Sequence, residues 1–138
     1  MANSSGSVTS LVGRILISLI FLMSGIEKAT GFSATAGFLV SRGVPLAAAA
    51  TGLAMIVELL GGIAVLAGFQ TRVASWILFL YLIPTTLLIH NFWSLQGEAR
   101  MDSQTDFLKN LAIMGGLLIL AANGAGGISA DAHRARTT

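Results

Sequence analysis

The sequence predicts an all-α protein that crosses a membrane as a bundle of four helices. Apolar residues make up 54% of the 138 residues and charged residues only 10%, whereas a soluble domain carries about 25% charged residues. The apolar residues gather in four long segments, each close to the roughly 20 helical residues that cross a bilayer. Because a helix satisfies its own backbone hydrogen bonds in lipid, each segment predicts a transmembrane helix.

The four predicted spans cover residues 8–27, 46–69, 73–92 and 107–123. Residues 1–7 form a polar leader that we expect to be disordered. The first span ends at Glu27-Lys28, and the second carries Glu58 near its middle. The fourth span is the shortest, and Lys109 near its start is expected to extend to the membrane interface.

The connections between the spans differ in character. Residues 29–45 are too amphipathic for a span and predict a short interfacial or re-entrant segment. Residues 70–72 predict a tight turn, and residues 94–106 form a polar loop. Residues 124–138 predict a polar tail that is first glycine-rich and then charged, with Gly124 ending the last span.

Charge and cysteine content restrict the possible partners. The net charge is only +2, and the basic residues are scattered along the chain, which argues against a nucleic-acid partner. The absence of cysteine excludes disulfides and thiolate metal sites in this chain. One side of the predicted bundle collects basic residues with few acids, which favours both termini in the cytoplasm. These are Arg14, Arg72, Arg134 and Arg136.

Glu58 is the most informative polar residue inside the apolar segments, because an unpaired carboxylate in lipid is costly. Three interpretations are compatible with its position. It forms a buried ion pair with Arg14 or Lys109 that sets the helix register, it relays protons or binds a ligand, or it contacts a partner subunit. Glycine pairs on neighbouring helical stripes, Gly61-Gly62 and Gly115-Gly116, predict close helix packing.

His90 ends the third span. It is interpreted either as an interfacial histidine bonded to a backbone carbonyl or as a group that handles a quinone or a proton. We expect no metal site, because the other histidine, His133, lies in the predicted tail. The aromatic residues of this span are interpreted as interface anchors or packing groups, namely Trp76, Tyr81 and Trp93.

Together these observations predict one polar cluster inside the bundle, which is a candidate site for a quinone or a proton. Its predicted members are Arg14, Glu58, His90, Asn91 and Lys109.

The order and spacing of these residues resemble the DoxX family from Arg14 to Asp131. The matching pieces are Arg14, Gly25-x-x-Lys28, Glu58-x-x-Gly61-Gly62, Gly68 with Thr71-Arg72, His90-Asn91-Phe92-Trp93, Lys109-Asn110, Gly115-Gly116 and Gly124-x-Gly126-x-x-Ser129-x-Asp131. The resemblance implies a four-helix protein of the bacterial inner membrane. Some members of that family are small membrane subunits of a thiosulfate:quinone oxidoreductase, also described as part of a terminal quinol oxidase. Others are membrane partners in oxidative-stress complexes. The family supplies no agreed catalytic set, so no catalytic residue is carried over.

From the residues and this resemblance we expect a non-catalytic or accessory subunit of a membrane complex linked to respiratory or redox metabolism. Such a subunit is not an enzyme on its own, and it associates with other membrane or peripheral subunits or with copies of itself. Two alternatives remain. One is a quinone-binding oxidoreductase subunit, with the quinone as its only expected cofactor. The other is a transporter of small molecules or lipids that acts as an oligomer.

Overall fold

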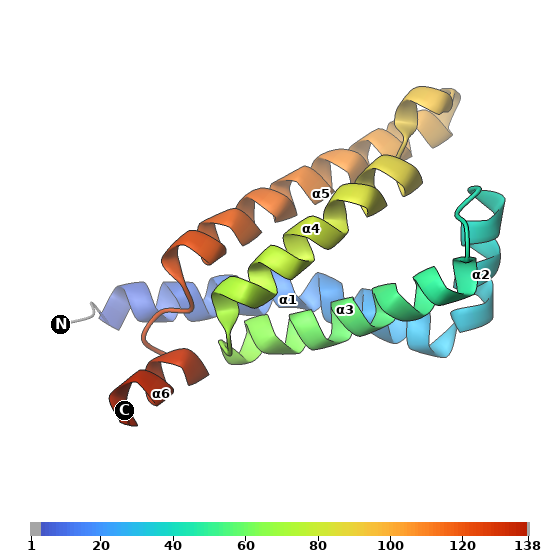
Figure 1. Ribbon diagram of the computed structural model, residues 1–138. Coiled ribbons are helices and arrows are strands. Elements are labelled where there is room, and N and C mark those ends of the chain that lie inside the picture. Colours follow the sequence, from blue (N-terminus) through green and yellow to red (C-terminus); the bar gives the residue numbers. More distant parts are fainter. Residues whose placement is uncertain (1–3, 138) are drawn as a thin grey trace.

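The computed structural model describes residues 4–137, and within that range it contains helices and no strand. Short connections join each helix to the next (Figure 1). In order they are α1 (Ser4–Thr30), α2 (Phe32–Ser41), α3 (Ala47–Ala67), α4 (Thr71–Ile89), the short 3₁₀ helix η1 (Phe92–Ser94), α5 (Gly97–Asn123) and α6 (Ala130–Thr137).

Four of these helices, α1, α3, α4 and α5, are long and apolar enough to cross a membrane, which confirms the predicted fold class. All four keep large apolar side chains exposed along their outer surfaces, for example Leu16, Leu53, Leu80 and Ile119. In a bilayer these side chains face lipid rather than water.

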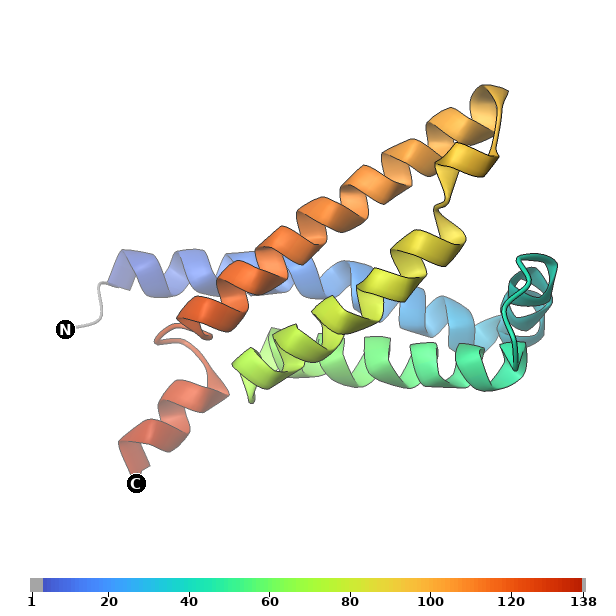
Figure 2. The same ribbon diagram turned by 45° about the horizontal axis from the view of Figure 1, so that its top comes forward.

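The four long helices form two pairs that diverge from one end of the molecule. Helix α1 lies along α3, and α4 lies along α5, as both views show (Figures 1 and 2). The two pairs are close together where α3 turns into α4, and they separate toward the end that carries α2 and η1. The start of α1 and helix α6 both lie at the closed end of this V.

Glycines allow the close approach of α1 to α3. A methyl group added at Gly25 of α1 would lie 2.7 Å from side-chain atoms of Leu59, and one added at Gly62 would lie 2.9 Å from Leu22. On the other side of α3, Leu78 of α4 packs onto Gly61 in the same way. Close packing of backbones over small residues is a usual source of helix association in membranes.

The predicted interfacial or re-entrant segment is the single helix α2. It packs against α3 near the open end of the V and buries none of its own residues. Arg42, which follows α2, donates hydrogen bonds to the carbonyl oxygen of Ile89 and to Oδ1 of Asn91. This arginine therefore links the α2–α3 connection to the end of α4.

Helices lie near both ends of the described range, where the sequence predicts none. Helix α1 already includes residues 4–7, which we predicted to be a disordered leader, while residues 1–3 lie outside the described part of the chain. The predicted polar tail contains helix α6. The segment before α6 packs on α1, since Ser10 Oγ donates a hydrogen bond to the carbonyl oxygen of Ala125.

The variant Gly25→Val tests the close contact between α1 and α3. We expect it to destabilise the fold by about 1–3 kcal/mol, because its side chain would overlap Leu59. The measurement is the thermal unfolding midpoint in detergent. Gly13→Val is the matched control on the same helix, since no atom lies within 4 Å of a methyl group added at Gly13. Equal midpoints for the two variants would contradict the packing described here.

Candidate functional site

A polar cluster forms around the carboxylate of Glu58, which is 4% exposed on α3. Tyr81 Oη of α4 donates a hydrogen bond of 2.7 Å to Oε1 of this carboxylate, and Ser24 Oγ of α1 donates one of 3.2 Å to the same oxygen. Lys28 Nζ of α1 lies 2.9 Å from Oε2. Side chains from three of the membrane-spanning helices therefore converge on one carboxylate.

The local sequence of α1 explains why two of its polar side chains face Glu58 together. Ser24 and Lys28 are one helical turn apart and so share a face of α1. Lys28 Nζ donates a hydrogen bond of 2.7 Å to Ser24 Oγ, which holds the ammonium beside the carboxylate. Gly25 lies between them in sequence and brings α1 close to α3 at Leu59, the residue after Glu58.

The cluster combines an ion pair with two hydroxyl groups. The Lys28 ammonium and the Glu58 carboxylate balance each other's charge, and both remain hydrogen-bonded in a mostly apolar bundle. The Lys28 side chain is 18% exposed, compared with 6% for that of Glu58. An entering polar molecule therefore meets Lys28 before it meets the carboxylate.

Arg14 lies in the N-terminal half of α1, far from Lys28, and it is 1% exposed. Its guanidinium donates hydrogen bonds to the carbonyl oxygens of Val65 and Leu66 at the end of α3 and of Ile128 in the segment before α6. The last carbonyls of a helix lack partners within the helix and carry partial negative charge. Arg14 thus caps α3 and holds the C-terminal segment against it.

Asp131, which belongs to the same C-terminal segment, caps the start of α4. Its two carboxylate oxygens accept hydrogen bonds from the backbone N–H groups of Gln70 and Thr71, at 2.7 and 3.0 Å. Partial burial raises the pKa of Asp131, but these hydrogen bonds and the charge of Arg134 outweigh it and hold the pKa below its ordinary value of 3.8. The Asp131 N–H also donates to the carbonyl oxygen of Gly68.

The open end of the V carries a third polar group. Asp106 Oδ1 lies 3.1 Å from Lys109 Nζ, and Asp106 Oδ2 lies 4.0 Å from His90 Nδ1. Lys109 and Asp106 are both on α5 and are largely exposed, so this group lies at the surface of the protein. Asn91 contacts Arg42 instead, as described above.

The five residues predicted to form one cluster are thus distributed over three places. Glu58 pairs with Lys28 rather than with Arg14 or Lys109. Arg14 and Lys28 are separated by about 21 Å along α1, because each helical residue advances the axis by about 1.5 Å. The single quinone or proton site predicted from the sequence therefore does not exist in that form.

Sequence reasoning missed Ser24, Lys28 and Tyr81 as members of the cluster. The spacing of Ser24 and Lys28 was a usable signal, since it places two polar groups on one face of an apolar helix. Tyr81 gave no such signal, because a tyrosine in a membrane span is usually an interface anchor. Among residues 4–137, no three His, Cys, Asp or Glu side chains lie close enough together to hold a metal ion.

Comparisons with known proteins agree with this architecture. The DoxX family model matches residues 9–91. The chain belongs to the DoxX family. It is 34% identical over 124 residues to the inner membrane protein YphA of Escherichia coli, covering 90% of this chain and 89% of that protein. It is 35% identical over 121 residues to the inner membrane protein YqjF of the same organism, covering 88% of each.

A further relative of this DoxX chain is the putative oxidoreductase CatD of Bacillus subtilis, at 30% identity over 100 residues. That alignment covers 72% of this chain and 73% of CatD. No solved structure gives a significant match. The family and the four spanning helices together place the chain in the inner membrane as a multi-pass protein, as predicted.

The variant Asp131→Asn tests the cap on α4. The folded-state pKa of Asp131 is lowered, so its stabilisation is complete well above pH 3.8 and is lost as the pH falls through that lowered pKa. We expect Asp131→Asn to lower the free energy of unfolding by about 1 kcal/mol at pH 7. We also expect the variant to lose less stability than wild type when the pH is lowered from 7 to 3. Thermal unfolding midpoints across this range measure both effects.

Asp102→Asn is the control for this experiment, because Asp102 is exposed near the start of α5 and takes no part in the cap on α4. Identical pH profiles for wild type and Asp131→Asn would show that the cap contributes nothing to the acid sensitivity of the fold.

Proposed function

We propose that this DoxX protein is an accessory subunit of an inner-membrane redox complex and that it binds the headgroup of a quinone at Ser24, Lys28, Glu58 and Tyr81. The observation that carries the proposal is the convergence of Tyr81 Oη and Lys28 Nζ on the buried Glu58 carboxylate. Polar groups kept inside a membrane bundle commonly mark ligand or proton pathways.

The donor set of the cluster fits a carbonyl oxygen. An ammonium group has three N–H donors, and Ser24 and Glu58 each accept from Lys28. Glu58 Oε2 also lies 2.9 Å from Lys28 Nζ, so a quinone carbonyl would take the place of one carboxylate contact, on the side chain that is the more exposed of the pair.

Each residue of the cluster has a role in this proposal. Lys28 orients the quinone carbonyl, and Ser24 holds the ammonium in place. Tyr81 donates its 2.7 Å hydrogen bond to Glu58 and so orients the carboxylate beside Lys28. When bound, the quinone supplies the redox chemistry, and a partner subunit supplies the electrons.

Two further features support an accessory role. Helix α5 has only Leu117 and Ala121 buried among its residues, so most of its length is available to another protein or to lipid. The relative CatD is named a putative oxidoreductase, which agrees with a redox context for this family member.

Quinone binding is tested with the purified protein in nanodiscs, titrated with a short-chain ubiquinone while tryptophan fluorescence is recorded. We expect Glu58→Gln to weaken binding about tenfold, because Lys28 loses its counter-charge, and Tyr81→Phe to weaken it about fivefold, because one hydrogen bond is lost. Glu27→Gln is the matched control, since Glu27 is exposed on the same turn of α1 as Lys28.

Tyr81→Phe removes a single oxygen, so it keeps the test decisive if Glu58→Gln fails to fold. Unchanged binding in both variants, or an equal loss in Glu27→Gln, would reject a quinone site at this cluster.

The accessory role is tested separately by affinity purification from native membranes in mild detergent. We expect a second protein to co-purify at a fixed ratio, and we expect the same ratio with Tyr81→Phe, because Tyr81 lies inside the bundle rather than on α5. Recovery of the chain alone, in a monodisperse peak, would contradict an accessory subunit.

A further inference from the structure

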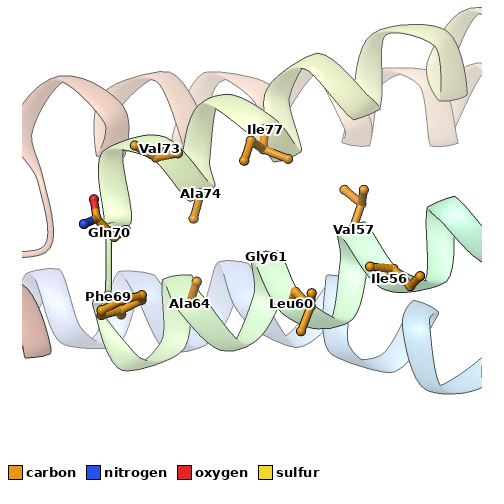
Figure 3. A pocket seen from close by; sticks show the side chains of 10 residues that line it. All are labelled: Ile56, Val57, Leu60, Gly61, Ala64, Phe69, Gln70, Val73, Ala74 and Ile77. Carbon is orange, nitrogen blue, oxygen red and sulfur yellow. The ribbon is translucent and has the colours of Figure 1, made fainter.

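An apolar groove runs along the outer surface between α3 and α4 (Figure 3). Its cavity volume is about 330 Å³. Small residues form the floor, namely Gly61 and Ala64 of α3 and Ala74 of α4, while Leu60 and Ile77 form part of the walls. In this view α1 and α5 lie behind the two helices, so the groove opens toward the surrounding lipid.

The length of the groove matches one leaflet of a bilayer. Its lining begins at Ile56 and reaches Phe69, just past the end of α3 at Ala67. The helical part from Ile56 to Ala67 is about 17 Å long. Half of the hydrocarbon core is about 15 Å thick. The groove therefore runs from near the middle of the bundle to the turn between α3 and α4, where the chain reaches the membrane surface.

The surface end of the groove carries positive charge. The guanidinium of Arg134 on α6 lies over the ring of Phe69, with Cζ 5.6 Å from the ring centre. Arg134 is exposed, as are Arg136 on the same helix and Arg72 at the start of α4. Asp131 also lies at this end; its carboxylate caps α4 and is close enough to Arg134 for the charge of the arginine to lower its pKa.

We propose that this groove binds one anionic phospholipid, with an acyl chain between α3 and α4 and its phosphate beside Arg134. The apolar groove, which is about as long as one leaflet is thick, matches the acyl chain, and the arginine at its surface end matches the phosphate. A second copy of the chain is a poorer occupant, because a two-fold dimer in one membrane brings the same arginines together at the same depth. This inference is independent of the proposed quinone site.

The test uses native mass spectrometry of the full chain released from nanodiscs that contain equal amounts of phosphatidylglycerol and phosphatidylcholine. We expect wild type to retain one phosphatidylglycerol. Val73→Trp, which narrows the groove from an exposed position, should reduce bound lipid about fivefold. Arg134→Gln should lower the preference for phosphatidylglycerol about tenfold, and Arg134→Lys should restore much of it.

Two matched controls should behave as wild type. Val12→Trp adds the same ring at an exposed position of α1, outside the groove, and Arg100→Gln removes an exposed arginine near the start of α5. Lipid retention unaffected by Val73→Trp would overturn the groove as the site. Equal retention of both lipids by wild type would overturn the role of Arg134. A dimer that Val73→Trp converts to a monomer would assign the groove to a second copy instead.

Discussion

The hydrocarbon interior requires a partner for every polar side chain, and this requirement decides how α1 meets α3. Arg14 binds carbonyl oxygens at the end of α3, and Lys28 pairs with Glu58 two turns of α3 earlier. Removing one partner of a buried ion pair costs on the order of 3–5 kcal/mol. Any shift of α1 along α3 breaks both interactions, so Arg14 and Lys28 set the register of the two helices. Gly25 permits the close contact between α1 and α3.

The α4–α5 pair is attached to this α1–α3 unit in a different way. Leu78 packs onto Gly61 near the closed end of the V, and Tyr81 adds the hydrogen bond to Glu58. Farther toward the open end, the contact is the polar link from Arg42 to the end of α4. The polar cluster therefore lies where the helix pairs begin to separate, which is why Lys28 keeps part of its side chain exposed.

Polar groups find their partners in different ways at the two ends of the bundle. At the closed end, Arg14 and Asp131 satisfy the free backbone groups of α3 and α4, and they bind the C-terminal segment in doing so. Toward the open end, Glu58 and its donors are held between helices rather than by helix ends. The proposed quinone site in the interior and the proposed lipid site on the outer surface therefore use separate residues.

The sequence by itself determined the four spans and the membrane location, because hydropathy and length are local properties of each segment. It also indicated that Glu58 needs a cation. Only the tertiary structure decided that this cation is Lys28, since helical spacing gives the face of a residue but not its depth against another helix. The same holds for Tyr81, which resembled an interface anchor, and for Asp131, which resembled part of a free tail. Their partners are distant in sequence, and only the packing of the helices brings them together.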